Sequence, residues 1–142
     1  MSRKGFIGLG VMGSAMAGHI ANKFSNVVVY NRTSDKANSW VKENGGEVAS
    51  NAAQVGELCE QVFLCVGNDE DVKKLVSGEE GILKTMKRGG VIVDHTTISA
   101  DVSIELSKLC SKQEVGFIDA PVSGGQAGAE SGMLTIMAGG EK

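Results

Sequence analysis

The chemistry that this sequence can support is most evident directly after the apolar pair at 6–7. The next six residues have three glycines at the spacing of a turn that joins a buried strand to a helix, and they are Gly8, Leu9, Gly10, Val11, Met12 and Gly13. The first glycine permits the tight turn, the second lets the backbone approach a pyrophosphate, and the third lets the helix pack closely on the sheet. Because unpaired amides at a helix start favour an anion, residues 8–13 are expected to hold the pyrophosphate of a dinucleotide. A tight turn in some other α/β domain is the alternative.

The residues that would select the cofactor follow the apolar run at 27–30. In a dinucleotide-binding fold the second strand ends beside the adenosine ribose, where an acidic residue accepts hydrogen bonds from the ribose hydroxyls. This chain has Asn31, Arg32 and Thr33 instead. The Arg32 guanidinium is planar and matches a phosphate, and Thr33 adds a hydroxyl. The predicted cofactor is therefore NADP, with NAD as the alternative if Arg32 is only a solvated loop arginine.

Two further polar loops follow predicted central strands, at the edge where an open sheet binds its ligand. The backbone of the first would line the path from the adenosine to the nicotinamide ribose, and this loop comprises Cys65, Val66, Gly67, Asn68 and Asp69. The second runs from Asp94 to Ile98, and its Thr96 would hydrogen-bond the nicotinamide end. Ordinary helix capping by Asn, Asp and Thr side chains explains both loops equally well from spacing alone.

A third loop, at 119–129, has the composition of an anion receptor. Pro121 fixes φ, and Gly124 and Gly125 leave adjacent backbone amides open beside the Ser123 hydroxyl. A substrate carboxylate held by Ser123, Gly124 and Gly125 would lie near the nicotinamide. A glycine-rich turn that carries a hydroxyl is the alternative.

Strands and helices that alternate along the whole chain would position these loops. The runs at 62–66 and 91–93 are continuously apolar, which is typical of parallel strands covered on both faces. The pattern predicts an α/β fold of the Rossmann type, with a doubly wound, mostly parallel sheet and helices on both faces. Strands are expected near 4–9, 26–31, 47–49, 61–66, 90–94, 115–119 and 133–138. Helices are expected near 11–24, 34–44, 51–58, 69–77 and 99–112, with a helical turn around 80–87.

Composition limits the remaining classes of function. With 142 residues, 42% hydrophobic and 22% charged, the chain has the size and polarity of one globular domain. A net charge of -3 gives no reason to expect nucleic acid, and no apolar run is long enough to span a bilayer. Cys59, Cys65 and Cys110 form no metal-binding pair and are expected to be reduced, mostly buried thiols of an intracellular protein. His19 and His95 are expected to be structural, and no metal site is predicted.

Four segments resemble the β-hydroxyacid dehydrogenase family. They are Gly-Phe-Ile-Gly-Leu-Gly-Val-Met-Gly at 5–13, Asn-Arg-Thr at 31–33, Asp-His-Thr-Thr-Ile at 94–98 and Asp-Ala-Pro-Val-Ser-Gly-Gly at 119–125. The family includes 3-hydroxyisobutyrate dehydrogenase, tartronate, glyoxylate and succinic semialdehyde reductases and, more distantly, 6-phosphogluconate dehydrogenase. The resemblance covers the whole chain, and the last motif is the most specific. It implies substrate binding by 123–125, a cofactor contact for Thr96, and a cofactor cradle formed by 8–13, 31–33 and 65–69.

The resemblance also implies hydride transfer between nicotinamide and a short hydroxy acid or semialdehyde, with a lysine as general acid/base. In the family that lysine lies on a later helix, and no residue of 1–142 matches it. Residues 1–142 are therefore expected to be the NADP-binding domain of a longer enzyme, without its helical C-terminal domain, and to be inactive alone. The Asn-Arg-Thr segment at 31–33 favours the NADPH-dependent semialdehyde or glyoxylate reductases. The parent enzyme is expected to be cytoplasmic and homo-oligomeric, with no nucleic-acid or membrane partner.

Two other functions stay open. One is a non-catalytic dinucleotide-binding or sensor module, which would have no use for a carboxylate receptor at 123–125. The other is a flavin or adenosine-nucleotide binder of the same fold, which the lack of an acidic residue at 31 disfavours.

Overall fold

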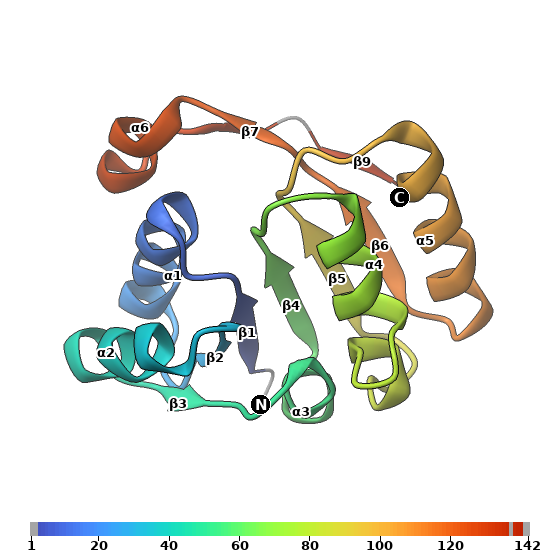
Figure 1. Cartoon of the computed structure of the whole chain (residues 1–142), viewed down its shortest axis with the longest axis horizontal. Helices are drawn as coiled ribbons and strands as arrows, with labels where there is room; N and C mark the ends of the chain where they lie inside the picture. Colours follow the sequence, from blue (N-terminus) through green and yellow to red (C-terminus); the bar gives the residue numbers. More distant parts are fainter. Residues whose placement is uncertain (1–2, 137, 141–142) are drawn as a thin grey trace.

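The computed structural model describes residues 3–136 and 138–140, which build a sheet with helices on both faces (Figure 1). The sheet has seven strands in the order β3-β2-β1-β4-β5-β6-β9. They are β1 (Lys4–Ile7), β2 (Val28–Tyr30), β3 (Glu47–Val48), β4 (Gln61–Leu64), β5 (Val91–Asp94), β6 (Gly116–Asp119) and β9 (Gly139–Gly140). Neighbouring strands from β3 to β6 pair in parallel, and β9 pairs antiparallel with β6. The strand order reverses between β1 and β4, which confirms the predicted Rossmann-type doubly wound sheet.

Each face of the sheet has its own hydrophobic core. On one face lie α1 (Val11–Lys23) and α2 (Ser34–Asn44), and on the other lie α3 (Ala52–Leu58), α4 (Asp69–Ser77), the 3-10 turn η1 (Ile82–Lys84) and α5 (Ala100–Lys112). Phe6 belongs to the core under α1 and α2, whereas Ile7 belongs to the core under α3, α4 and α5. Successive side chains of a strand point to opposite faces, so one strand contributes to both cores. None of the described helices is long and apolar enough to cross a membrane.

Polar side chains cap the start of three helices. Asn51, Asn68 and Ser99 precede α3, α4 and α5, and each accepts a hydrogen bond from a backbone N–H in the first turn. Gly45 and Gly46 follow α2 with positive φ, and a Cβ on Gly46 would lie 2.4 Å from the Val27 carbonyl oxygen. The two glycines thus end α2 and let the chain turn back toward β3.

The prediction is wrong in the last quarter of the chain. The loop expected at 119–129 contains β7 (Val122–Ser123) and most of α6 (Gly125–Ser131). Of the described residues in 133–138, expected to form one strand, only Thr135–Ile136 form a strand (β8), which pairs with β7 in a separate two-stranded sheet. Residue 137 lies outside the described residues, and β9 then joins the main sheet. An apolar run predicts extended backbone, but it does not say where the chain leaves one sheet for another.

Candidate functional site

The glycine-rich loop joins β1 to α1 on the side of the sheet where the parallel strands end (Figure 1). Gly8 has a φ of +101°, and a Cβ there would lie 2.1 Å from the Cys65 carbonyl oxygen. Only glycine fits at this close approach of the loops after β1 and β4. A Cβ on Gly13 would lie 1.9 Å from the Gly8 carbonyl oxygen, so the absence of a side chain lets α1 pack against the loop.

Gly10 differs from these two glycines, because a Cβ at this position would meet no atom within 4 Å. Its φ of −72° is open to any residue. The packing of the protein therefore does not require glycine at this position. A ligand that lies against the backbone would require it, because a Cβ would occupy the ligand's space. The next residue begins α1, whose first turn has no acidic residue and whose first N–H groups have no intrahelical partners. The loop therefore fits the pyrophosphate of a dinucleotide.

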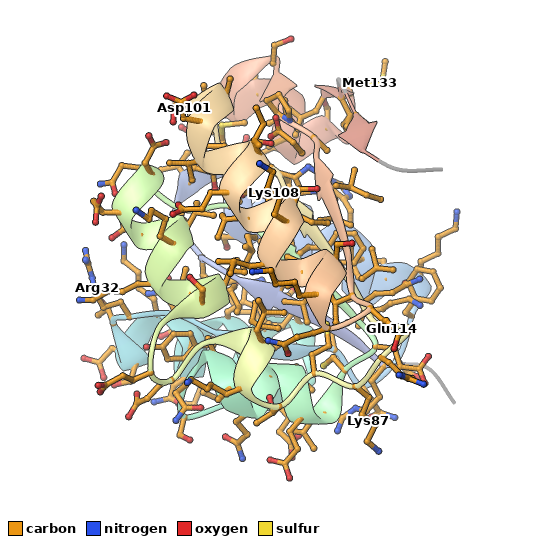
Figure 2. All side chains as sticks on the ribbon, turned by 90° about the vertical axis from the view of Figure 1, so that its right-hand side faces the viewer. Arg32, Lys87, Asp101, Lys108, Glu114 and Met133 are labelled. Carbon is orange, nitrogen blue, oxygen red and sulfur yellow. The ribbon has the colours of Figure 1, made fainter. Side chains whose placement is uncertain are left out.

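The end of β2 is tied to the glycine-rich loop by Asn31. The Leu9 N–H donates to Asn31 Oδ1 at 2.8 Å, and Asn31 Nδ2 donates to the Thr33 carbonyl oxygen at 3.0 Å. Asn31 thus shapes the loop through its side chain, a role that sequence reasoning missed. Arg32, by contrast, is exposed and extends away from the fold (Figure 2). Within residues 3–136 and 138–140, it has no hydrogen bond or ion pair, so its guanidinium is available to a ligand.

A hollow extends from the glycine-rich loop along α2. It is lined by Leu9, Gly10, Val11, Ser14, Asp35, Lys36, Ser39, Trp40 and Glu43. Lys36 was not selected from the sequence, although a basic residue in the first turn of the helix after Arg32 is a signal for a second phosphate contact. Asp35 and Glu43 border the same hollow, so its charge is mixed. Trp40 Nε1 donates to the Ser14 carbonyl oxygen at 3.1 Å and holds α2 against α1.

The loops after β4 and β5 are held together by hydrogen bonds. The Val66 N–H donates to Thr96 Oγ1 at 3.0 Å, and the Thr96 N–H donates to Asp94 Oδ1, also at 3.0 Å. Thr96 is 4% exposed, so its hydroxyl supports the Val66 backbone from inside the fold. Nearer the surface, Asp69 Oδ1 accepts a hydrogen bond from the Ser99 N–H at 2.9 Å. Direct contact of Thr96 or the 65–69 loop with a cofactor stays a prediction.

The carboxyl of Asp94 is fully buried. The pKa of Asp94 is raised to about 6, mainly by burial. Hydrogen bonds with the backbone and side chain of Thr96 partly offset this rise. The negative charges of nearby Asp119 and Asp69 contribute to the raised pKa. Asp94 and Asp119 are register partners on β5 and β6, so their side chains lie on the same face of the sheet. Among the described residues, neither Asp94 Oδ2 nor Asp119 Oδ1 has a hydrogen-bond partner.

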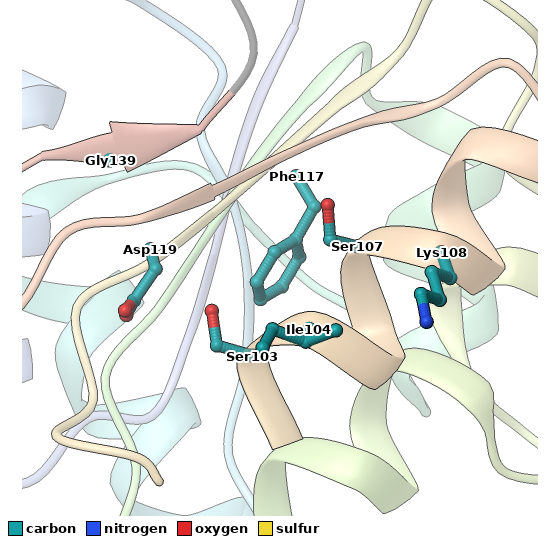
Figure 3. A pocket seen from close by; sticks show the side chains of 7 residues that line it. All are labelled: Ser103, Ile104, Ser107, Lys108, Phe117, Asp119 and Gly139. Atoms are coloured by element: carbon teal, nitrogen blue, oxygen red, sulfur yellow. The ribbon is translucent and has the colours of Figure 1, made fainter. Parts of the chain in front are cut away.

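A second hollow, of about 380 Å³, lies between α5 and the β6–β9 edge of the sheet (Figure 3). Its lining consists of Ser103, Ile104, Ser107, Lys108, Phe117, Asp119 and Gly139. Burial raises the pKa of Asp119, and a hydrogen bond with Ser103 opposes that shift. Figure 3 shows the Lys108 side chain directed away from Asp119. None of the residues predicted to bind cofactor or substrate borders this hollow.

The predicted carboxylate receptor lies where β7 meets α6. Ser123, Gly124 and Gly125 are exposed, and the two glycines have φ values of +125° and +61°. Residues with a side chain rarely adopt either conformation. Backbone geometry alone therefore explains why both positions are glycine. Figure 1 shows β7 and α6 on the side where the central strands end, with α6 beside α1. The fold thus brings 123–125 to the same side of the sheet as the glycine-rich loop, and binding of a substrate there stays a prediction.

Both histidines make structural hydrogen bonds, as predicted. His95 Nδ1 lies 2.8 Å from the Ala120 carbonyl oxygen, and the His95 ring stacks on Phe63. Burial lowers the pKa of His95. His19, on α1, bonds to carbonyl oxygens of α6. In the part of the chain that the structure describes, no group of three or more His, Cys, Asp or Glu residues could hold a metal ion.

The cysteine thiols lie mostly inside the fold. Cys59 and Cys110 are buried and Cys65 is partly buried, and none of the three forms a disulfide. Burial raises the pKa of Cys59 to about 11 and that of Cys110 to about 12. Both thiols are therefore protonated and unreactive at neutral pH.

Known proteins resemble this chain along its whole length. The family model described as the NAD binding domain of 6-phosphogluconate dehydrogenase matches residues 3–142. An uncharacterized oxidoreductase of Shewanella frigidimarina is 49% identical over 142 residues, which are 100% of this chain and 49% of that protein. The mitochondrial 3-hydroxyisobutyrate dehydrogenase of Mus musculus is 40% identical over 136 residues, which are 96% of this chain and 40% of that protein.

Solved structures show the same relationship. Mycobacterium tuberculosis 3-hydroxyisobutyrate dehydrogenase with L-serine matches with a TM-score of 0.90 and 26% identity, over 100% of this chain and 47% of that one. Psf3 in complex with NADP+ and 2-OPP also gives a TM-score of 0.90, with 29% identity over 97% of this chain and 49% of that one. The chain therefore spans about half the length of the relatives it matches.

Proposed function

Because this chain belongs to the family of the NAD binding domain of 6-phosphogluconate dehydrogenase, it is an NAD(P)-binding domain, and we propose that it serves a hydroxy acid dehydrogenase or semialdehyde reductase. The relative in Mus musculus is named a 3-hydroxyisobutyrate dehydrogenase, and a structural neighbour of the same name is in a complex with L-serine, itself a β-hydroxy acid. The single observation that carries the proposal is the open space at Gly10, where the protein needs no glycine and a cofactor does.

Each part of the site has a distinct role in this proposal. The amides at the start of α1 bind the pyrophosphate, and the loop at 65–69 lines the path toward the nicotinamide. Thr96 holds Val66 in place through the hydrogen bond to its N–H. Ser123, Gly124 and Gly125 bind the carboxylate of the substrate through the hydroxyl and adjacent amides. The bound nicotinamide supplies the chemistry, which is hydride transfer to or from the substrate carbon.

We further propose that the cofactor is NADP. Arg32 is exposed and has no protein partner among the described residues, and Lys36 lies in the first turn of the helix that follows it. Two cations beside the end of β2 suit the 2′-phosphate of NADP, and Asn31 adds no negative charge to repel it. The NADP+ in the Psf3 complex supports the same choice. A catalytic lysine outside residues 1–142, a homo-oligomeric parent and a cytoplasmic location belong to the proposal as well.

Calorimetric titration with NADPH and NADH tests the proposal. We expect the wild-type chain to prefer NADPH, and Arg32→Ala to weaken NADPH binding by about tenfold, because a charge-assisted hydrogen bond contributes about 1.5 kcal/mol or more. NADH binding should not change in Arg32→Ala. The matched control is Arg88→Ala, which removes an exposed arginine that pairs with Glu114 instead. A wild-type preference for NADH, or equal losses for both cofactors in Arg32→Ala, would refute the NADP assignment.

A further inference from the structure

The segment from β7 to β8, residues 122–136, is attached to the sheet domain by few polar contacts. α6 has only seven residues, too few to be stable alone, and Ala129 is its one residue buried in the fold. Leu134 packs on the segment from within, 3.2 Å from where a Cβ of Gly124 or Gly128 would lie. Something outside the segment must therefore hold α6 in its place beside α1.

His19 of α1 makes that connection. Its Nε2 lies 2.8 Å from the Ala129 carbonyl oxygen and 3.1 Å from that of Glu130. Carbonyl oxygens only accept, so Nε2 carries a hydrogen and donates it to the end of α6. These carbonyls belong to the last turn of the helix, where backbone oxygens have no i+4 partner within the helix, although the Ala129 oxygen also accepts from the Gly132 N–H at 3.3 Å. A Cβ on Gly132, which ends α6 with a φ of +73°, would lie 3.6 Å from the His19 ring.

No other side chain shares this role. Among the side chains that the structure describes, His19 alone forms a side-chain hydrogen bond between 122–136 and the rest of the chain. Gln126 bonds to Glu130, and Ser131 bonds to Ala127 and Gly128, all within α6. The start of α1 carries the proposed pyrophosphate site, and the start of α6 carries the proposed carboxylate receptor. The His19 contact therefore joins the two helices whose separation sets the distance between these sites.

We propose that His19 is a positioning residue that holds α6, and with it Ser123–Gly125, in a fixed place relative to the glycine-rich loop. The placement of α6 stands on the hydrogen bonds alone, whereas its consequence for substrate rests on the function proposed above. His19 touches neither cofactor nor substrate in this arrangement. It acts through the backbone of α6.

The tautomer of His19 is the first test. The contact requires the Nε2–H form of neutral His19, whereas His95, which bonds through Nδ1 to a carbonyl oxygen, requires the Nδ1–H form. Long-range proton–nitrogen NMR spectra at about pH 9, where imidazole is neutral, distinguish the two forms. We expect opposite tautomers for the two histidines. An Nδ1–H form of His19 would refute the proposal.

Variants at position 19 form the second test. His19→Leu replaces the imidazole with an apolar group of similar size that has no hydrogen-bond donor. His19→Gln restores an N–H donor at about the same distance from the backbone as Nε2. Amide exchange in α6 should be about fivefold faster in His19→Leu, the loss expected for one hydrogen bond, and close to wild type in His19→Gln. Asn22→Ala, at an exposed position on the same helix, is the matched control. Unchanged α6 exchange in His19→Leu, or no recovery in His19→Gln, would overturn the positioning role.

Ligand titration separates this proposal from the proposed function. With NADPH saturating, 3-hydroxyisobutyrate should bind His19→Leu about fivefold more weakly than wild type, while the Kd of NADPH itself changes less than about twofold. Equal binding of 3-hydroxyisobutyrate by both proteins would show that α6 position does not matter for the receptor and would overturn the proposal. If the wild-type chain binds no 3-hydroxyisobutyrate, the substrate assignment fails, and the exchange rates still decide the role of His19.

Discussion

Alanine at Gly10 and at Gly13 should separate cofactor binding from folding. The two glycines belong to one loop, but their surroundings differ. A Cβ on Gly10 would have nothing within 4 Å, whereas a Cβ on Gly13 would lie 1.9 Å from the Gly8 carbonyl oxygen and 3.3 Å from the Phe6 ring. The first substitution adds a methyl group to the space assigned to the cofactor. The second adds it to a contact inside the protein.

The structure gives the expected magnitudes. In Gly10→Ala, reduced freedom of the unfolded chain stabilises by about 0.4–1 kcal/mol, and replacement of glycine at a helix N-cap costs a similar amount. The free energy of unfolding should therefore change by less than about 1 kcal/mol. Gly13→Ala forces the backbone of the loop to shift, which costs about 1–3 kcal/mol, as overpacking does in other cores. NADPH binding should weaken at least about tenfold in Gly10→Ala, because the added methyl displaces the pyrophosphate from the amides.

Urea denaturation and calorimetric titration of the two variants measure these effects. Gly10→Ala is expected to unfold with the wild-type midpoint and to lose cofactor affinity, whereas Gly13→Ala is expected to lose stability first. Gly45→Ala, at a positive-φ position with open space and away from the loop, controls for a glycine whose role is purely conformational. Unchanged NADPH affinity in Gly10→Ala, with wild-type stability, would refute the placement of the cofactor on this loop.

The remaining predictions concern the buried polar residues behind the site. Thr96→Val should lower the free energy of unfolding by about 1–3 kcal/mol and weaken NADPH binding, because it leaves the Val66 N–H without its acceptor. Exposed Thr97→Val is the control, and equal effects of the two changes would contradict the account. Asp94→Asn should flatten the pH dependence of stability between about pH 4 and pH 6. The folded-state pKa of about 6 exceeds the ordinary 3.8, so the folded protein binds the proton more tightly, and stability from Asp94 is present at low pH and lost as pH rises to 6. The expected loss of stability is about 3 kcal/mol. Urea unfolding of wild type and Asp94→Asn across this pH range measures it, with exposed Asp101→Asn as the control. A pH slope in Asp94→Asn equal to that of wild type would contradict the prediction.

The sequence was sufficient to predict the architecture, because the elements that define it have local signals. Continuous apolar runs marked the buried parallel strands, and Asn68 and Ser99 marked helix starts through hydrogen bonds that span only one turn. The motif at 8–13 predicted a turn whose steric requirements involve its own backbone. Interactions between residues a few positions apart produce local sequence patterns, so the elements that depend on them can be predicted from the sequence.

The end of the chain lacked such a pattern. β7 and β8 have two residues each and pair with one another, and α6 is defined by glycine conformations and by packing on α1. Sequence reasoning therefore predicted a loop at 119–129 and one strand at 133–138. The receptor residues at 123–125 were identified from their composition and from resemblance to a family motif, whereas their place between β7 and α6, beside α1, required the fold.

Contacts between distant residues decided the details of the site. The Leu9 N–H donates to the Asn31 side chain, and the Val66 N–H donates to the Thr96 hydroxyl. His19 bonds to a carbonyl oxygen of α6. Nothing in the spacing of these residues predicts which donor meets which acceptor, because the partners come together only when the sheet has formed. The sequence by itself determined the fold class, the glycine-rich loop and the family of chemistry, since each depends on local backbone geometry or on a contiguous motif. Only the tertiary structure decided which polar side chains are exposed and which support the loops from behind, because burial and pairing are properties of the assembled fold.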